Sequence, residues 1–199
     1  YWRFAQRISF ANSKSQKYID VPGGSKDAGT KLIIFQSNNG KNQAFDLISV
    51  ANSEDYYIRN VNSKKYLGLT GDQINAGVQV EQQDFTGGMT QRFQLEGVAD
   101  FTYKIVPSGS ALALDIRFQD TKDRSAIVLD SKQATSSQNW LMYGYNPERK
   151  SDAVKQVKNE LKDAGKAVGS KVVETGGKAV EKTKEVTNKA KDKLKKLFK

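Results

Sequence analysis

The sequence predicts an all-β domain made of three copies of one unit, joined to a C-terminal α-helical extension. Two observations carry this prediction: a motif that recurs at a fixed interval over residues 1–146, and a change of composition after that point. The motif is a Gln followed two residues later by an aromatic residue. It occurs at Gln43/Phe45, Gln91/Phe93 and Gln138/Trp140.

The three motifs are 48 and 47 residues apart, and each Gln lies 22 residues after the end of a short apolar run. These runs span residues 18–21, 66–69 and 113–116. Self-similarity at such a period indicates one supersecondary unit per copy, which is too small to bury its apolar face alone. We therefore expect a threefold body with one shared core, in which the three motif aromatics point inward together. Three equivalent pockets are more typical of binding than of catalysis.

Each copy is predicted to consist of short strands separated by turns. Polar and apolar residues alternate over 57–61 and 78–81, and turn residues follow at even intervals, as in Pro22-Gly23-Gly24 and Asn38-Asn39-Gly40. No helical period of 3.6 residues is sustained over three turns in residues 1–146. Short strands of even spacing predict a barrel or sandwich rather than βαβ units.

The composition disfavours catalysis and metal binding. The chain has no Cys and no His, which removes thiolate chemistry, the usual general base near neutral pH and the usual metal ligand. No spacing singles out a Ser–Lys pair or a carboxylate dyad, so we predict that the protein is not an enzyme and uses no metal and no cofactor. No apolar run approaches the ~18 residues of a membrane span. Because the chain begins with Tyr1 rather than Met, we expect a processed or trimmed product, secreted or associated with a membrane surface.

Residues 57–69, Gly77-Val78-Gln79-Val80 and Gln91-Arg92-Phe93 together resemble the repeat of the ricin B-type β-trefoil lectins, which carry QxW repeats. The resemblance covers about three quarters of the chain. It implies a β-trefoil of twelve strands over residues 1–146, four strands per repeat, with a six-stranded barrel capped by three hairpins. It also implies that the domain is a carbohydrate-binding lectin.

The resemblance further implies where a sugar would bind. A working pocket of this family has an Asp in the first apolar run that accepts hydrogen bonds from two sugar hydroxyls. It also has an aromatic on which the apolar face of the sugar stacks, and an Asn just before the motif Gln. In the first repeat these positions hold Asp20, Phe35, Asn42 and Gln43, which are the predicted carbohydrate-binding residues.

The other two repeats depart from this pattern. The second has Gly68 in place of the Asp and Gln83 in place of the aromatic, which predicts a dead pocket. The third keeps Asp115 and Gln138 but has Asp130 at the stacking position and Ser137 in place of the Asn. We therefore expect weaker, modified binding at Asp115 and Gln138, and one good pocket in the first repeat.

Asp20 and Phe35 also have a purely structural interpretation. An Asp that precedes Pro22-Gly23-Gly24 is typical of a residue that stabilises a turn through local backbone N–H groups. Phe35 ends the apolar run 32–35, which fits a core position. Both interpretations remain open on the sequence.

Residues 151–199 hold 14 Lys and no Arg against 7 Asp plus Glu, so this segment carries +7 of the net charge of +10. Small or apolar residues recur from Val154 to Leu197 in twelve steps, with a mean spacing of about 3.6 residues, which is a helical period. We predict a linker at residues 147–151 and a basic amphipathic helical tail at residues 152–199, with a hinge at residues 176–177.

Three partners of the tail stay open. Lys residues that flank a narrow apolar stripe favour an anionic membrane surface. A polyanion such as nucleic acid or an acidic polysaccharide is the second alternative, although the absence of Arg and of interleaved aromatics disfavours sequence-specific nucleic-acid binding. The third is a solvated spacer or docking helix. The residues predicted to contact a membrane or polyanion are Lys182, Lys184, Lys189, Lys191, Lys193, Leu194, Lys195, Lys196, Leu197 and Phe198.

The predicted function is a lectin for galactose-type or other cell-surface sugars, coupled to a helix that binds or perturbs anionic membranes. A toxin-like, defensive or adhesion lectin fits this organisation. The alternative is a sugar-blind β-trefoil interaction scaffold, whose helical tail serves protein or polyanion docking or stress protection.

Overall fold

The computed structural model describes residues 6–145, and this part of the chain is all-β. It contains twelve strands and six 3₁₀-helices of one turn each, with no α-helix among the described residues. The β-trefoil prediction is confirmed. The predicted linker, helical tail and hinge, all within residues 147–199, lie outside the described residues.

The three repeats have the same order of elements: two strands, a 3₁₀-helix, a third strand, and a second 3₁₀-helix before the fourth strand. The first repeat contains β1 (Gln6–Asn12), β2 (Tyr18–Asp20), η1 (Pro22–Gly24), β3 (Ile33–Phe35), η2 (Lys41–Gln43) and β4 (Phe45–Ser49). The second contains β5 (Tyr56–Asn60), β6 (Tyr66–Leu69), η3 (Thr70–Asp72), β7 (Val80–Gln83), η4 (Met89–Gln91) and β8 (Phe93–Ala99). The third contains β9 (Thr102–Pro107), β10 (Leu112–Ile116), η5 (Arg117–Gln119), β11 (Ile127–Ser131), η6 (Ser136–Gln138) and β12 (Trp140–Gly144).

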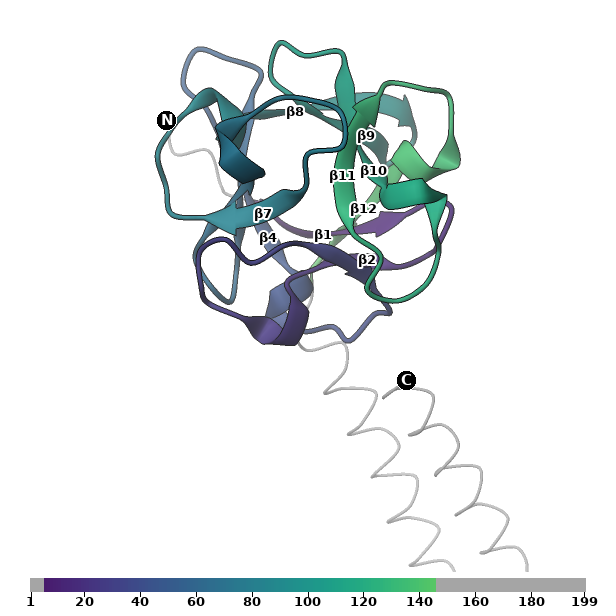
Figure 1. The fold of residues 1–199 in the computed structure, drawn as a ribbon. Helices are drawn as coiled ribbons and strands as arrows, with labels where there is room; N and C mark the ends of the chain where they lie inside the picture. The colour runs from purple at the N-terminus through teal and green to yellow at the C-terminus, as the bar shows by residue number, and fades with distance from the viewer. Residues whose placement is uncertain (1–5, 146–199) are drawn as a thin grey trace, which may run out of the picture. The chain divides into compact units, whose positions relative to one another are not determined.

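The first and fourth strands of each repeat form a closed antiparallel barrel. Its order is β1-β4-β5-β8-β9-β12, and the pairing of β12 with β1 completes the ring. Figure 1 shows β12 and β1 side by side at this closure. A closed barrel leaves none of its six strands with an unpaired edge.

The second and third strands of each repeat form three hairpins, β2–β3, β6–β7 and β10–β11. Single backbone bridges connect each hairpin to the other two, so that the three repeats meet in a pseudo-threefold arrangement. The bridges are Lys31↔Glu81, Gln79↔Val128 and Ile33↔Ala126.

Phe45, Phe93 and Trp140 are fully buried in one common core, as their equivalent spacing predicts. The buried indole of Trp140 donates a hydrogen bond from Nε1 to the carbonyl of Leu114 at 3.1 Å. Burial of each ring contributes roughly 1.5–3 kcal/mol through apolar area. Because each ring begins a barrel strand directly after a 3₁₀-helix, its burial also fixes the motif Gln two residues earlier.

Candidate functional site

In the first repeat, the side-chain amide of the motif Gln holds a carboxylate in place by a hydrogen bond. Gln43 is buried, and its Nε2 donates to Asp20 Oδ2 at 2.7 Å and to the carbonyl of Gln36 at 2.8 Å. Its Oε1 accepts from the Asn38 N–H at 3.0 Å. The amide therefore ties β2, the end of β3 and the following loop together, and it fixes one oxygen of Asp20.

The third repeat has the same set of hydrogen bonds. Gln138 Nε2 donates to Asp115 Oδ2 at 3.0 Å and to the carbonyl of Ser131 at 2.8 Å, while Oε1 accepts from the Gln133 N–H at 2.8 Å. The equivalence explains the interval between the apolar run and the motif: β2 and β10 each bring a carboxylate to the amide of their own repeat.

A pocket of about 600 Å³ opens on the first repeat. It brings together three of the four predicted residues, Asp20, Phe35 and Asn42, whereas Gln43 lies behind Asp20 and does not line it. The lining residues are Asp20, Pro22, Gly23, Gly24, Ile33, Phe35, Asn38, Asn42 and Arg124.

The Asp20 carboxylate is held by one oxygen and offers the other. Oδ2 accepts from Asn42 Nδ2 at 3.0 Å as well as from Gln43, whereas Oδ1 accepts no hydrogen bond from the residues that the structure describes. Burial raises the pKa of Asp20, and the hydrogen bonds from Gln43 and Asn42 offset only part of this rise. The result is a preoriented acceptor at the wall of a pocket.

Strand alternation places Phe35 on the pocket side of β3. Ile34 is fully buried in the core, while Ile33 and Phe35, on the opposite face of the strand, are partly exposed. Neighbouring residues of a strand point to opposite faces, so Phe35 is not a core residue. Its ring lines the same pocket as Asp20.

Arg124 is a pocket residue that the sequence did not indicate. It comes from the third repeat, between η5 and β11, and its N–H donates to the carbonyl of Ile34 at 2.8 Å. Its side chain is exposed, lines the first pocket, and acts to lower the pKa of Asp20 through its charge. Spacing within one repeat contains no signal for this contact between repeats.

Two residues of the second repeat hold the first pocket from behind. Asn60 Nδ2 donates to the carbonyls of Asn42 at 3.1 Å and Ala44 at 3.3 Å, on either side of Gln43. Asn62 Nδ2 donates to the carbonyl of Gly24 at 2.8 Å. The 48-residue interval between Asn12 and Asn60 is a signal that could have identified this role, because Asn12 Nδ2 bonds the carbonyl of Ser137 in the equivalent place at 2.7 Å.

In the second repeat, a side chain fills the place of the missing carboxylate. Gln91 Nε2 donates to Gln83 Oε1 at 3.2 Å and to the carbonyl of Asp84 at 2.7 Å, so the Gln83 amide takes the role of the carboxylate. A Cβ at Gly68 would overlap that amide. Gln83 thus folds over Gly68 in the repeat for which the sequence predicts a dead pocket.

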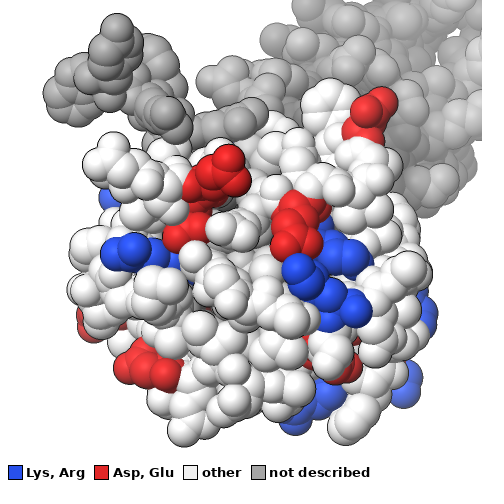
Figure 2. All heavy atoms as spheres, turned by 90° about the horizontal axis from the view of Figure 1, so that it is seen from above, with Lys and Arg blue, Asp and Glu red and all other residues white. Residues whose placement is uncertain are grey.

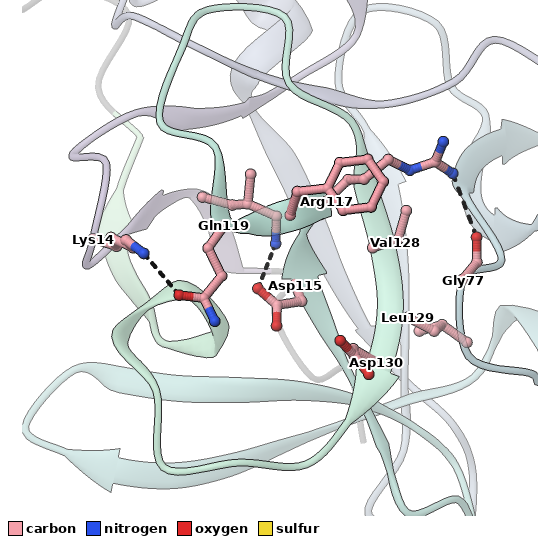
Figure 3. Close-up of a pocket in the computed structure, with 10 residues that line it drawn as sticks. Lys14, Gly77, Asp115, Arg117, Gln119, Val128, Leu129 and Asp130 are labelled. Atoms are coloured by element: carbon pink, nitrogen blue, oxygen red, sulfur yellow. Dashed lines mark hydrogen bonds between the residues drawn. The ribbon is translucent and has the colours of Figure 1, made fainter.

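The third repeat has a pocket of about 720 Å³ that contains the predicted Asp115, with Gln138 behind it. Figure 3 shows Asp115 between two pairs of residues: Lys14 Nζ, which donates to Gln119 Oε1 at 2.8 Å, and Arg117, whose Nη2 lies 3.5 Å from the Gly77 carbonyl. Asp115 Oδ1 also accepts from the Ile116 N–H at 2.7 Å.

Charges on the described residues are nearly balanced, with 15 Lys plus Arg and 14 Asp plus Glu over 6–145. Figure 2 shows both signs interspersed on one face. Within 6–145 there is no cluster of carboxylates that could hold a metal ion, and no helix long and apolar enough to cross a membrane. The predicted membrane or polyanion contacts, residues 182–198, lie outside the described range.

The chain belongs to the ricin-type β-trefoil lectin domain-like family, whose model matches residues 1–83 and, in a second overlapping match, residues 41–130. Two shifted matches are what a repeated unit produces. A search of curated proteins finds no significant match.

Three solved structures illustrate the likeness. A designed threefold-symmetric protein, ThreeFoil, is 26% identical with a TM-score of 0.66, over 68% of this chain and 96% of that one. The exo-β-1,3-galactanase 1,3Gal43A of Clostridium thermocellum is also 26% identical with a TM-score of 0.66, over 71% of this chain but only 31% of the enzyme. The Macrolepiota procera ricin B-like lectin, solved with lactose, shares the fold at 18% identity with a TM-score of 0.59, over 71% of this chain and 97% of that one.

Proposed function

We propose that residues 1–146 form a non-enzymatic carbohydrate-recognition module that binds galactose-type or other cell-surface sugars in the first-repeat pocket. The observation that carries this proposal is the Asp20 carboxylate. Its Oδ2 accepts from Asn42 and Gln43, whereas its Oδ1 accepts no hydrogen bond from residues 6–145, and Asp20 lines the same pocket as Phe35. A few placed polar groups on a largely apolar wall are typical of small-ligand sites.

Each residue has a distinct task. Asp20 Oδ1 accepts hydrogen bonds from adjacent sugar hydroxyls, and hydrogen bonds to an ionised acceptor are stronger than neutral ones. The Phe35 ring takes the apolar face of the pyranose, and Asn42 orients the carboxylate. Gln43 acts by positioning Asp20, because its amide hydrogens are already used within the protein.

A glycan array tests the proposal. Wild type is compared with Asp20→Asn, which keeps the shape and an oxygen for Gln43, and with Phe35→Ala. Asp84→Asn is the control, because the Asp84 side chain is exposed and lines neither the first-repeat nor the third-repeat pocket. We expect signals on galactosides that both pocket variants lose and the control keeps. Equal signals from wild type and Asp20→Asn would exclude Asp20 as the sugar acceptor.

We propose that the basic tail, residues 152–199, adds a second contact with anionic membranes. Its support is the net charge of +7 together with the helical spacing of its apolar residues. Linking two weak contacts makes the second one intramolecular, which raises avidity by about 10²–10⁴-fold. A toxin-like, defensive or adhesion protein, secreted or held at a membrane surface, fits such a pair.

Vesicle leakage tests the tail. The full chain and a version ending at residue 150 are added to dye-loaded vesicles, either of phosphatidylcholine alone or with phosphatidylserine. Leakage should require the anionic lipid and should fall sharply with the shortened chain. If the two chains release dye equally, the tail does not perturb membranes.

The alternative function is a sugar-blind trefoil scaffold with a docking tail for protein or polyanion. The second repeat favours it, because this repeat keeps the fold with Gly68 in place of the Asp and the Gln83 amide in place of the carboxylate. An array without any signal that depends on Asp20 would favour the scaffold.

A further inference from the structure

The interior of the barrel ends in a pocket that shares no residue with the first-repeat and third-repeat pockets. Leu47, Leu95 and Met142 each follow a motif aromatic by two residues, so each points to the same face of its strand as that aromatic. The motif aromatics are fully buried, whereas Leu95 and Met142 are partly exposed at the edge of the core. A pocket of about 910 Å³ opens on this layer, and we call it the barrel-end pocket.

The barrel-end pocket has carboxylates but no cation in its wall. Glu54, Asp55 and Glu96 line it, and no Lys or Arg is found among the lining residues that the structure describes. The Glu54 carboxylate has no hydrogen bond or ion pair with residues 6–145. Glu96 pairs with Lys132 through Oε1 at 2.9 Å, and its Oε2 has no partner in the same range. The wall therefore carries an excess of negative charge.

Asp55 is a buried carboxylate without an ion pair. It is 5% exposed, and it accepts from two neutral groups, Gln94 Nε2 at 3.0 Å and Ser108 Oγ at 2.8 Å. The buried Asp46 has ion pairs with two Arg side chains, whereas Asp55 has none within residues 6–145. Burial acts to raise the pKa of Asp55, but hydrogen bonds from Ser108 and Gln94, helped by the charge of Arg92, outweigh it and hold that pKa below its ordinary value. The carboxylate is therefore ionised at neutral pH.

Comparison of the repeats shows which charge is missing. Arg7 and Asp46 lie 48 residues before Asp55 and Gln94, and they form an ion pair at 2.9 Å. In the second repeat the same two positions hold a carboxylate and a neutral amide, which are joined by the hydrogen bond from Gln94. The contact is kept, but its positive charge is lost. Each oxygen of Asp55 accepts one hydrogen bond and has room for a second.

Two tyrosines lie beside these carboxylates. Tyr56 and Tyr103 both line the barrel-end pocket and are partly exposed. Their hydroxyls have no hydrogen-bond partner within residues 6–145. Aromatic rings attract cations as well as apolar groups. The pocket thus offers negative charge, aromatic rings and apolar surface to a single ligand.

We propose that the barrel-end pocket binds an organic ammonium ion that carries an apolar body. The ammonium group donates hydrogen bonds to Asp55 and Glu54 and lies against the two tyrosines, while the apolar body covers Leu95 and Met142. Hydrogen bonds between charged groups are stronger than neutral ones, and small-ligand sites typically have volumes of about 300–1,000 Å³. The ammonium group belongs either to a free amine or to a Lys side chain of a partner protein. This site does not depend on the proposed sugar binding.

Protein-observed NMR of the full chain, titrated with phenethylamine, tests the proposal. 2-Phenylethanol is the neutral comparison, because it has the same ring and a hydroxyl in place of the ammonium group. The variants are Asp55→Asn and Glu54→Gln; Glu54 is exposed, so the second variant tests the charge without disturbing a buried group. Asp84→Asn is the matched control, since it also removes one negative charge but lies outside the three pockets described.

We expect saturating shifts around residues 54–56 and 94–96 with phenethylamine, and at least tenfold weaker binding of 2-phenylethanol. Glu54→Gln and Asp55→Asn should each weaken phenethylamine binding at least fivefold, while Asp84→Asn leaves it unchanged. Lactose should cause no shifts in these segments. The blocked peptide Gly-Lys-Gly distinguishes the two sources of the ammonium group: binding as tight as that of phenethylamine assigns the site to a protein Lys, and weaker binding assigns it to a free amine.

Other outcomes overturn the inference. Equal affinities for phenethylamine and 2-phenylethanol would show that the pocket does not select a cation. Equal phenethylamine affinities in wild type, Glu54→Gln and Asp55→Asn would show that these carboxylates do not hold the ligand. Saturating shifts with lactose would make the pocket a sugar site, and the absence of saturating shifts with every probe would mean that it binds none of these ligands. A glycan array without signal would contradict the proposed sugar binding and leave this inference standing.

Discussion

Replacing Gly68 by Ala tests whether the Gln83 side chain closes the second-repeat pocket. The added methyl group would overlap the Gln83 amide, which must then move. Movement breaks the hydrogen bonds from its Nε2 to the Leu69 carbonyl at 3.0 Å and to Glu81 Oε1 at 2.9 Å. It also breaks the hydrogen bond that Gln91 donates to its Oε1 at 3.2 Å.

The expected magnitude follows from these contacts. Each hydrogen bond contributes about 1 kcal/mol net, so Gly68→Ala should lower the free energy of unfolding by about 2–4 kcal/mol. In a Gln83→Ala background, the three atoms nearest to the added methyl group are absent. There it should be neutral or stabilise by about 0.5–1 kcal/mol, because Gly is unfavourable inside a strand. The two changes should therefore couple by about 3 kcal/mol.

Urea denaturation of wild type, the two single variants and the double variant measures this coupling. Gly97→Ala is the control, since Gly97 also lies in a strand but has open space around its Cβ position; this change should alter stability little. If Gly68→Ala costs the same with and without Gln83, then Gln83 does not close the pocket and the reasoning fails.

Three further outcomes are expected. Burial raises the pKa of Asp20, so the native state binds a proton on this carboxylate more tightly than the unfolded chain does. Asp20→Asn should therefore raise the stability against urea at neutral pH. This gain should shrink as pH falls through the raised pKa and vanish below the unfolded pKa of about 3.9. Burial acts to raise the pKa of Asp46, but hydrogen bonds from Arg7 and Arg59 outweigh it and hold that pKa below its ordinary value. The stability this carboxylate contributes is present above about pH 3.9 and is lost as pH falls through the lowered pKa, so acid titration of urea midpoints should show a loss in wild type that Asp46→Asn lacks. Trp140→Ala should cost about 3–5 kcal/mol by thermal denaturation followed by circular dichroism, and a cost below about 1 kcal/mol would contradict the central place of this ring in the core.

The features that the sequence predicted are those whose partners lie in the same repeat. The chain between Asp20 and Gln43 passes through the β2–β3 hairpin and then comes back to β2, where Gln43 bonds Asp20. The fixed spacing between the two residues therefore corresponds to a contact. The same holds for Asp115 and Gln138. The burial of the motif aromatics follows from the same register, because the body needs one large side chain per repeat at its centre.

Most contacts between repeats were not predictable from spacing. Arg124 reaches the first pocket from the third repeat, and Asn60 and Asn62 support it from the second. Closure of the barrel creates these contacts, and of the three only Asn60 has a counterpart at a repeat interval, Asn12, which lies 48 residues earlier. Departures from the repeat pattern were visible in the sequence, and Gly68 with Gln83 predicted a dead pocket. The sequence did not indicate that the Gln83 amide takes the place of the carboxylate, or that Phe118 has the left-handed backbone of the Gly in the other two copies.

The register of β1 against β12 sets Ile8 opposite Gly144, so the first and last strands of the barrel are neighbours, just as β4 and β5 are at the boundary between the first two repeats. A circular permutant that links these strands and opens the turn at residues 50–55 would keep every strand beside the same partners. The strand pairing of the barrel therefore does not depend on which of the three repeats comes first in the chain.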